Sequence, residues 1–103
     1  SESAYAAAIA HADVQINQWQ TRVASGKTVG NFAERVSVLE KTVKKDFNKK
    51  VVGATQLAVR ERGERLRMIE DHILRQAQRL FRQQLLVLEF TVTNDFRRDL
   101  IKI

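Results

Sequence analysis

Ser25-Gly26-Lys27-Thr28 is the stretch closest to a chemical motif, because it matches the end of a phosphate-binding P-loop. The complete motif requires a glycine five residues before Gly26 and a strand upstream, since glycine-rich backbone amides must wrap around the phosphate. Position 21 is Thr21, and the residues before it are patterned as a long amphipathic helix. We therefore interpret Ser25-Gly26 as a helix stop and expect no nucleotide or other cofactor at this loop.

The two histidines, His11 and His72, are the next candidates for catalysis or metal binding. They lie in different predicted helices, and neither belongs to an HxxxH pair or to a carboxylate–histidine spacing that points to metal. Asp71 adjoins His72, but neighbouring helix positions project about 100° apart, so the two side chains do not form a dyad. We expect both histidines to be surface or packed side chains, with no catalytic residue and no metal ligand in the chain.

Basic residues form the clearest polar pattern. The net charge is +6, and because residues 1–26 carry Glu2 and Asp13 against Arg22, the remainder carries +7. A basic body attracts nucleic acid, anionic lipid surfaces or acidic proteins. Acidic residues interleave with the basic ones, so a simple solvated face is the alternative. The candidate contacts are Lys41, Lys44, Lys45 and Lys49 in one stripe, and Arg75, Arg79 and Arg82 in a second.

The elements that position these groups are predicted to be long helices. Between Ser3, a candidate cap, and Ala24, apolar residues recur in alternating steps of 4 and 3, which keeps one seam on one side of a helix. A second helix begins at Asn31, which with Glu34 resembles a capping box, and Gly53 is its candidate end. The two seams are Tyr5, Ile9, Ala12, Ile16, Trp19 and Val23 in the first helix, and Phe32, Val36, Leu39, Val43, Phe47 and Val51 in the second.

A third helix is predicted over at least residues 54–89, which makes it roughly 50 Å long. It carries two adjacent seams, and together they form a stripe wide enough to contact two other helices. The first seam consists of Leu66, Ile69, Ile73, Ala77 and Leu80, and the second of Phe81, Leu85, Leu88 and Val92.

Residues 85–93 admit a second interpretation as a buried strand. Leu85 to Leu88 are apolar all round, and Thr91-Val92-Thr93 is β-branched. We expect helix, because the flanks are helical and no second strand candidate exists to pair with this one. Asn94 is a candidate cap for a short fourth helix.

The sequence as a whole predicts an all-α fold, an elongated antiparallel bundle of three long helices with a short fourth as a variant. The 103 residues contain no proline to interrupt the helices and no apolar run long enough to cross a membrane. We expect a single helical domain over residues 1–103, a piece or subunit of a larger assembly. Its packing residues are Tyr5, Ile9, Ile16, Trp19, Val23, Phe32, Leu39, Phe47, Leu66, Ile73 and Leu80.

These patterns favour a non-catalytic bundle that mediates protein–protein assembly, with a protein partner or a second copy as its contact. A basic module for nucleic acid or an anionic membrane surface is the alternative. The sequence contains no cysteine, which excludes disulfides and thiol catalysis and fits a reducing compartment such as the cytoplasm or an organelle interior.

One resemblance rests on the order of the predicted helices. An Ala-rich first helix, a second helix with spaced phenylalanines and a long charged third helix resemble the helical middle domain of atlastin or guanylate-binding-type GTPases. The resemblance implies a lever attached to a GTPase domain outside this sequence. It assigns no role to any single residue of this chain.

Overall fold

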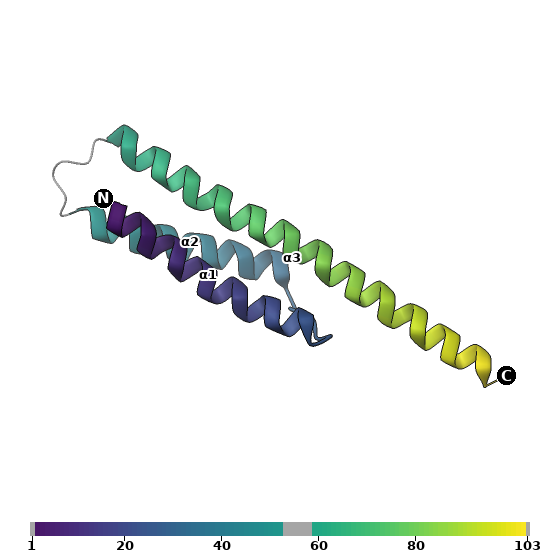
Figure 1. The fold of residues 1–103 in the computed structure, drawn as a ribbon. Coiled ribbons are helices and arrows are strands. Elements are labelled where there is room, and N and C mark those ends of the chain that lie inside the picture. The colour runs from purple at the N-terminus through teal and green to yellow at the C-terminus, as the bar shows by residue number, and fades with distance from the viewer. Residues whose placement is uncertain (1, 53–58, 103) are drawn as a thin grey trace.

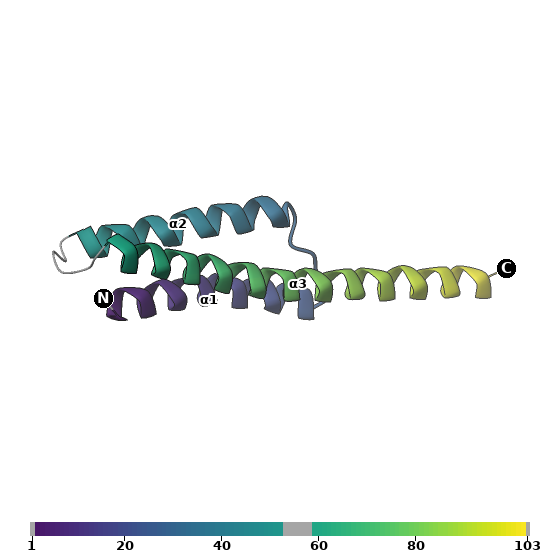
Figure 2. The same cartoon turned by 90° about the horizontal axis from the view of Figure 1, so that it is seen from above.

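The computed structural model describes residues 2–52 and 59–102, and within these ranges the chain is all-α. Three helices, α1 (Glu2–Ala24), α2 (Phe32–Val52) and α3 (Val59–Ile101), run antiparallel in chain order and pack against one another (Figures 1 and 2). The molecule measures 71 × 18 × 18 Å. The prediction of an elongated antiparallel bundle of three long helices is thus confirmed. The predicted helix end at Gly53 and the first residues of the third helix, 54–58, lie outside the described residues.

Residues 85–101 continue α3 as one uninterrupted helix, so the strand alternative is excluded. A fourth helix capped by Asn94 is wrong, because Asn94 lies inside α3. The sequence places neither proline nor glycine between Gly63 and the end of α3. The two β-branched threonines fit the helix because their hydroxyls donate to carbonyls one turn earlier, over 3.0 Å from Thr91 to Val87 and 2.9 Å from Thr93 to Glu89.

One face of each helix builds the core. Ile16, Trp19 and Val23 of α1 are buried, but Ala4 and Ala8 occupy the deep positions of the first two turns, while Tyr5 and Ile9 are only half-buried beside them. The buried face at the start of α1 is therefore turned slightly away from the predicted seam. The largest fully buried side chains are Phe47, Ile69, Ile73, Val23 and Val43.

The end of α1 is a Schellman motif centred on Gly26, which adopts a left-handed φ of 81°. The Gly26 amide donates to the Val23 carbonyl over 3.0 Å, and the Lys27 amide donates to the Arg22 carbonyl over 3.0 Å. The Ser25-Gly26 stop is therefore present as predicted. These bonds satisfy carbonyls that would otherwise be unpaired at the helix end.

The start of α2 differs from the predicted capping box. Asn31 has a φ of 51°, in the left-handed region, whereas a capping residue is usually extended. Its carbonyl accepts the first helical hydrogen bond from the Arg35 amide over 2.9 Å, and the Arg35 side chain donates to the Gly30 carbonyl over 2.8 Å. Asparagine tolerates this conformation better than most residues, which accounts for its place at the turn.

We predict opposite effects of alanine at two glycines. Gly63 lies inside α3 with open space where a Cβ would be, so Gly63→Ala should raise the free energy of unfolding by about 0.5–1 kcal/mol. Gly26→Ala should lower it by about 1–2 kcal/mol, because alanine is strained in the left-handed region. Urea denaturation followed by circular dichroism measures both changes. Equal effects of the two substitutions would contradict the local geometry of the turn.

Candidate protein–protein interface

The first two helices cover only the first half of α3. The loop between α1 and α2 closes over α3 at Val29, which is buried and whose backbone amide donates to the Gln84 side-chain oxygen over 2.8 Å. Beyond this contact, residues 85–101 project past the end of the bundle (Figures 1 and 2), and we call them the α3 extension. Val87 is half-buried against the core, and every residue from 88 to 102 is exposed.

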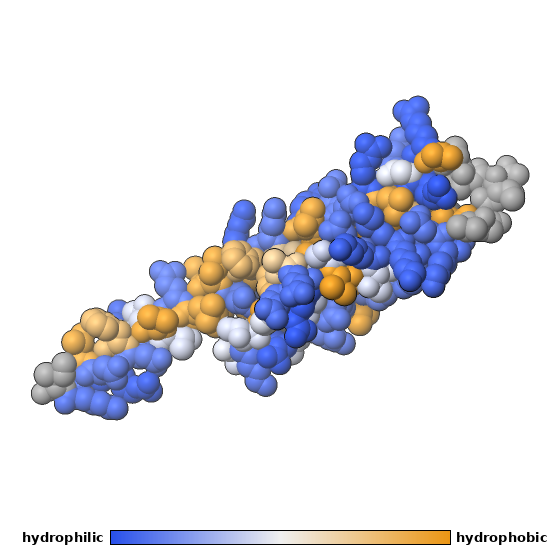
Figure 3. Space-filling view, turned by 180° about the vertical axis from the view of Figure 1, so that it is seen from behind, coloured by the Kyte–Doolittle hydropathy of each residue, from blue (hydrophilic) through white to orange (hydrophobic). Residues whose placement is uncertain are grey.

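The α3 extension carries large apolar side chains in open solvent. Three of them, Leu85, Leu88 and Val92, continue a row that begins at Phe81 just before the extension. The four follow one another in steps of 4, 3 and 4 along one side of α3, and we call them the C-terminal stripe. They are 46%, 49%, 39% and 67% exposed. Figure 3 shows hydrophobic residues running along this part of the molecule toward the C-terminal end.

The prediction that the second seam contacts another helix of the chain holds only at Phe81, which stacks on Phe32 of α2, and is wrong for Leu85, Leu88 and Val92, which are exposed. The reason is length: α1 and α2 contain 23 and 21 residues, whereas α3 contains 43. Two helices of that size end where α3 is half complete, so its second half has no helix to cover it.

An apolar groove borders the C-terminal stripe where it meets the bundle. The groove lies between the start of α2 and the middle of α3, has a volume of about 440 Å³, and is lined by residues that include Phe32, Leu74, Phe81 and Arg82. The Phe32 ring is stacked on Phe81, with centroids 6.1 Å apart and planes inclined by 2°. It also meets Trp19 edge-on at 5.7 Å. The stripe therefore begins at a residue whose ring is packed against α2.

Both histidines form contacts that the sequence did not predict, because each pairs with a carboxylate on another helix. His72 Nε2 lies 2.7 Å from the Asp13 carboxylate of α1, and His11 Nδ1 lies 3.4 Å from the Asp46 carboxylate of α2. The partners of the closer pair are 59 residues apart in the chain, so spacing gives no signal for them. Each pair joins two helices, and no group of three or more metal-ligating side chains exists among the described residues.

The predicted lysine stripe is divided between two roles. Lys44 is half-buried and forms an ion pair with Glu70 of α3, with Glu40 of its own helix 3.9 Å away. Lys41, Lys45 and Lys49 are exposed. Lys44 therefore ties α2 to α3, and three lysines are left to face solvent.

The arginine stripe remains at the surface. Arg75, Arg79 and Arg82 are all exposed, and Arg75 Nε donates to the backbone carbonyl of Asp71 over 3.3 Å. Arg82 also lines the apolar groove. These arginines lie on the helix that carries the C-terminal stripe, so charge and apolar surface occur on the same element.

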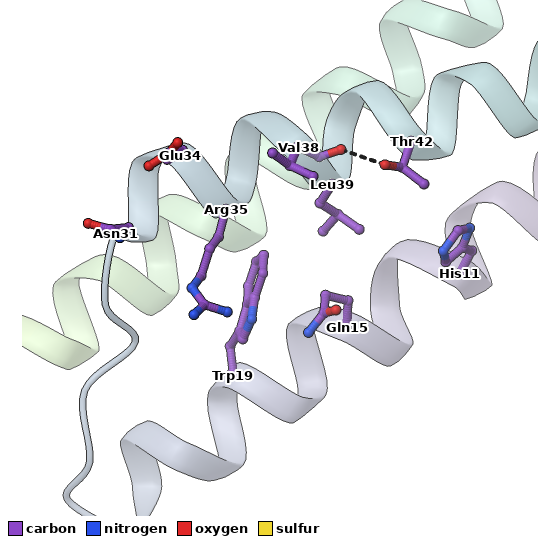
Figure 4. A pocket seen from close by; sticks show the side chains of 9 residues that line it. All are labelled: His11, Gln15, Trp19, Asn31, Glu34, Arg35, Val38, Leu39 and Thr42. Atoms are coloured by element: carbon purple, nitrogen blue, oxygen red, sulfur yellow. Dashed lines mark hydrogen bonds between the residues drawn. The ribbon is translucent and has the colours of Figure 1, made fainter.

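A second groove, of about 460 Å³, opens between α1 and α2 (Figure 4). Its nine lining residues include His11, Trp19 and Arg35, and the side chains of Arg35 and Trp19 lie next to each other in Figure 4. Thr42, at the rim, donates its hydroxyl to the Val38 carbonyl of its own helix over 2.8 Å. These nine residues supply no nucleophile hydrogen-bonded to a base, which is the arrangement that covalent catalysis requires.

The comparisons with known proteins give no relative for this chain: no protein-family profile, no curated protein and no solved structure matches it. The resemblance to the middle domain of atlastin or guanylate-binding-type GTPases therefore stays a prediction. Within the described residues no helix is long and apolar enough to cross a membrane.

We predict that the core and the α3 extension respond differently to truncation. Ile73 is completely buried, so Ile73→Ala should lower the free energy of unfolding by about 2–5 kcal/mol. Val92→Ala should change it by less than about 0.5 kcal/mol in dilute protein, because Val92 is exposed. Urea denaturation at low concentration measures both. A large loss from Val92→Ala in dilute protein would show that the extension packs on its own bundle.

Proposed function

We propose that this chain is a non-catalytic helical bundle that mediates protein–protein assembly, as a stalk, arm or middle domain of a larger machine. The α3 extension is the proposed contact surface. The bundle of α1, α2 and the first half of α3 is the base that holds this surface in place.

One observation carries the proposal. Nine large apolar residues between Phe81 and Ile101 are exposed on a single helix: Phe81, Leu85, Leu86, Leu88, Phe90, Val92, Phe96, Leu100 and Ile101. Scattered apolar residues are normal on a protein surface, but a contiguous apolar surface marks a site of interaction with another molecule. The steps of 4, 3 and 4 along the C-terminal stripe are those of a helix that packs against another helix.

Photo-cross-linking in the cells that produce the chain tests this proposal. A photoreactive amino acid in place of Val92 should yield a discrete protein adduct, and the same amino acid in place of the exposed Gln20 of α1 should not. The adduct should disappear when Leu85 and Leu88 are both replaced by glutamine. Absence of any adduct specific to position 92 would refute assembly through the α3 extension.

Binding to a polyanion is the second candidate function, and the exposed positions of Lys41, Lys45 and Lys49 favour it. If these lysines contact phosphates, affinity for nucleic acid or anionic vesicles should fall steeply with salt. Replacing the three by glutamine should then reduce the slope of that dependence by about 2–3. Lys44 should be kept, since its ion pair joins α2 to α3. Binding that is insensitive to salt, measured by fluorescence anisotropy, would exclude this candidate.

A further inference from the structure

We propose that a second copy of this chain covers the C-terminal stripe, and that the two α3 extensions pair antiparallel about a two-fold axis between Leu86 and Val87. The inference rests on the proposed assembly function and deepens it by naming the partner. Self-complementary surfaces of this kind produce closed two-fold dimers, in which each residue of the patch is used twice.

The apolar residues define the register. In an antiparallel pair about this axis, Phe81 faces Val92 of the partner subunit, and Leu85 faces Leu88 of the partner subunit. The reverse contacts follow by symmetry, so four successive layers are entirely apolar. The steps of 4 and 3 place these residues at the a and d positions of a heptad, which are the positions that fill such an interface.

Polar residues close the interface at both ends. Gln78 precedes Phe81 and Asp95 follows Val92 in the same heptad positions. In the proposed register Gln78 faces Asp95 of the partner subunit, so these polar groups meet each other at the ends of the apolar layers. A shift by one heptad in either direction would bring Gln78 or Asp95 against a leucine, and burying an unpaired polar group is costly. The pattern therefore specifies one register.

Charge on the flank favours the antiparallel direction. Arg82 and Glu89 are seven residues apart, so they lie on the same flank of the stripe, at the e position of successive heptads. In an antiparallel pair e residues face e residues, which brings Arg82 close to Glu89 of the partner subunit on both sides of the axis. Among the described residues neither side chain forms an ion pair within its own chain. In a parallel pair these residues would instead face the uncharged g positions five residues before them, Ala77 and Gln84.

The apolar groove at the bundle end extends the same surface. In the proposed register residues 92–99 of the partner subunit lie level with residues 74–81, which include the groove residues Leu74, Ala77 and Phe81. Only the Phe81 end of the groove meets an apolar residue in this register, Val92 of the partner subunit, because Asp95 and Asp99 of the partner subunit lie level with Gln78 and Leu74. Leu86 and Phe90 lie on the opposite side of α3 and stay outside the pairing.

Sedimentation velocity of the purified chain tests the dimer. A monomer–dimer equilibrium is expected, and Leu88→Gln should weaken it by about a hundredfold, because Leu88 lies in a central layer. Phe90→Gln is the matched control and should leave the equilibrium unchanged. A chain that stays monomeric at all concentrations, or a dimer that Phe90→Gln disrupts and Leu88→Gln does not, overturns the proposal.

Charge exchange tests the antiparallel contact. Arg82→Glu should weaken the dimer by about tenfold, because two attractive contacts become repulsive. The double variant Arg82→Glu, Glu89→Arg should restore it, while Arg79→Glu, on the far side of α3, should have little effect. Failure of the double variant to recover affinity contradicts the proposed register.

Cysteine cross-linking tests direction directly, because the chain contains no cysteine of its own. A mixture of Phe81→Cys and Val92→Cys chains should form the mixed disulfide in preference to either symmetric one. Preferential symmetric disulfides would mean parallel pairing and would overturn the proposal. If the purified chain is monomeric but position 92 still cross-links to another protein in cells, self-pairing fails and assembly stands. If neither the dimer of the purified chain nor the cross-linked adduct in cells forms, both the self-pairing and the assembly proposals fail.

Discussion

The difference in helix length is the constraint on which the rest of this structure depends. A helix rises about 1.5 Å per residue, so the 43 residues of α3 span about 65 Å while α1 and α2 each span about half of that. A three-helix core therefore exists only over the first half of α3. Beyond Val87 the second half is exposed, and its large apolar residues are what the proposed partner would cover.

The bundle half is fixed by contacts that connect every pair of helices. Glu2 of α1 pairs with Arg65 of α3, and the Arg65 guanidinium also lies 4.9 Å from the centre of the Tyr5 ring. Lys44 joins α2 to α3, and His11 joins α1 to α2. Pairs that are exposed to water in this way contribute little free energy individually. Their effect is on arrangement, because each one pairs a particular residue of one helix with a particular residue of its neighbour.

The sequence predicted what depends on local pattern and missed what depends on helix ends and on distant partners. The seams of α2 and of the first half of α3 are apparent from spacing alone, and so is the glycine stop at Gly26. The sequence could not predict that Ala4 and Ala8 lie deeper than Tyr5 and Ile9, since alanine gives only a weak apolar signal. The pairing of His72 with Asp13 could not be predicted from the sequence either, because it arises only when α1 and α3 lie side by side.

The prediction that most of the C-terminal stripe packs on another helix of the same chain was wrong, and the error shows what hydrophobic periodicity leaves undetermined. Periodicity identifies a face that packs against a helix, but it does not say which helix, and the lengths of α1 and α2 decide that in this chain. An isolated helix the size of the α3 extension is marginal in water because its first turn is costly to form. Here the first half of α3 already supplies that turn, so the extension propagates from a folded base. The proposed partner would then meet a preformed helix and need not order it, which would lower the entropic cost of binding. Under the proposed function, the bundle half is therefore the element that preforms the exposed half for binding.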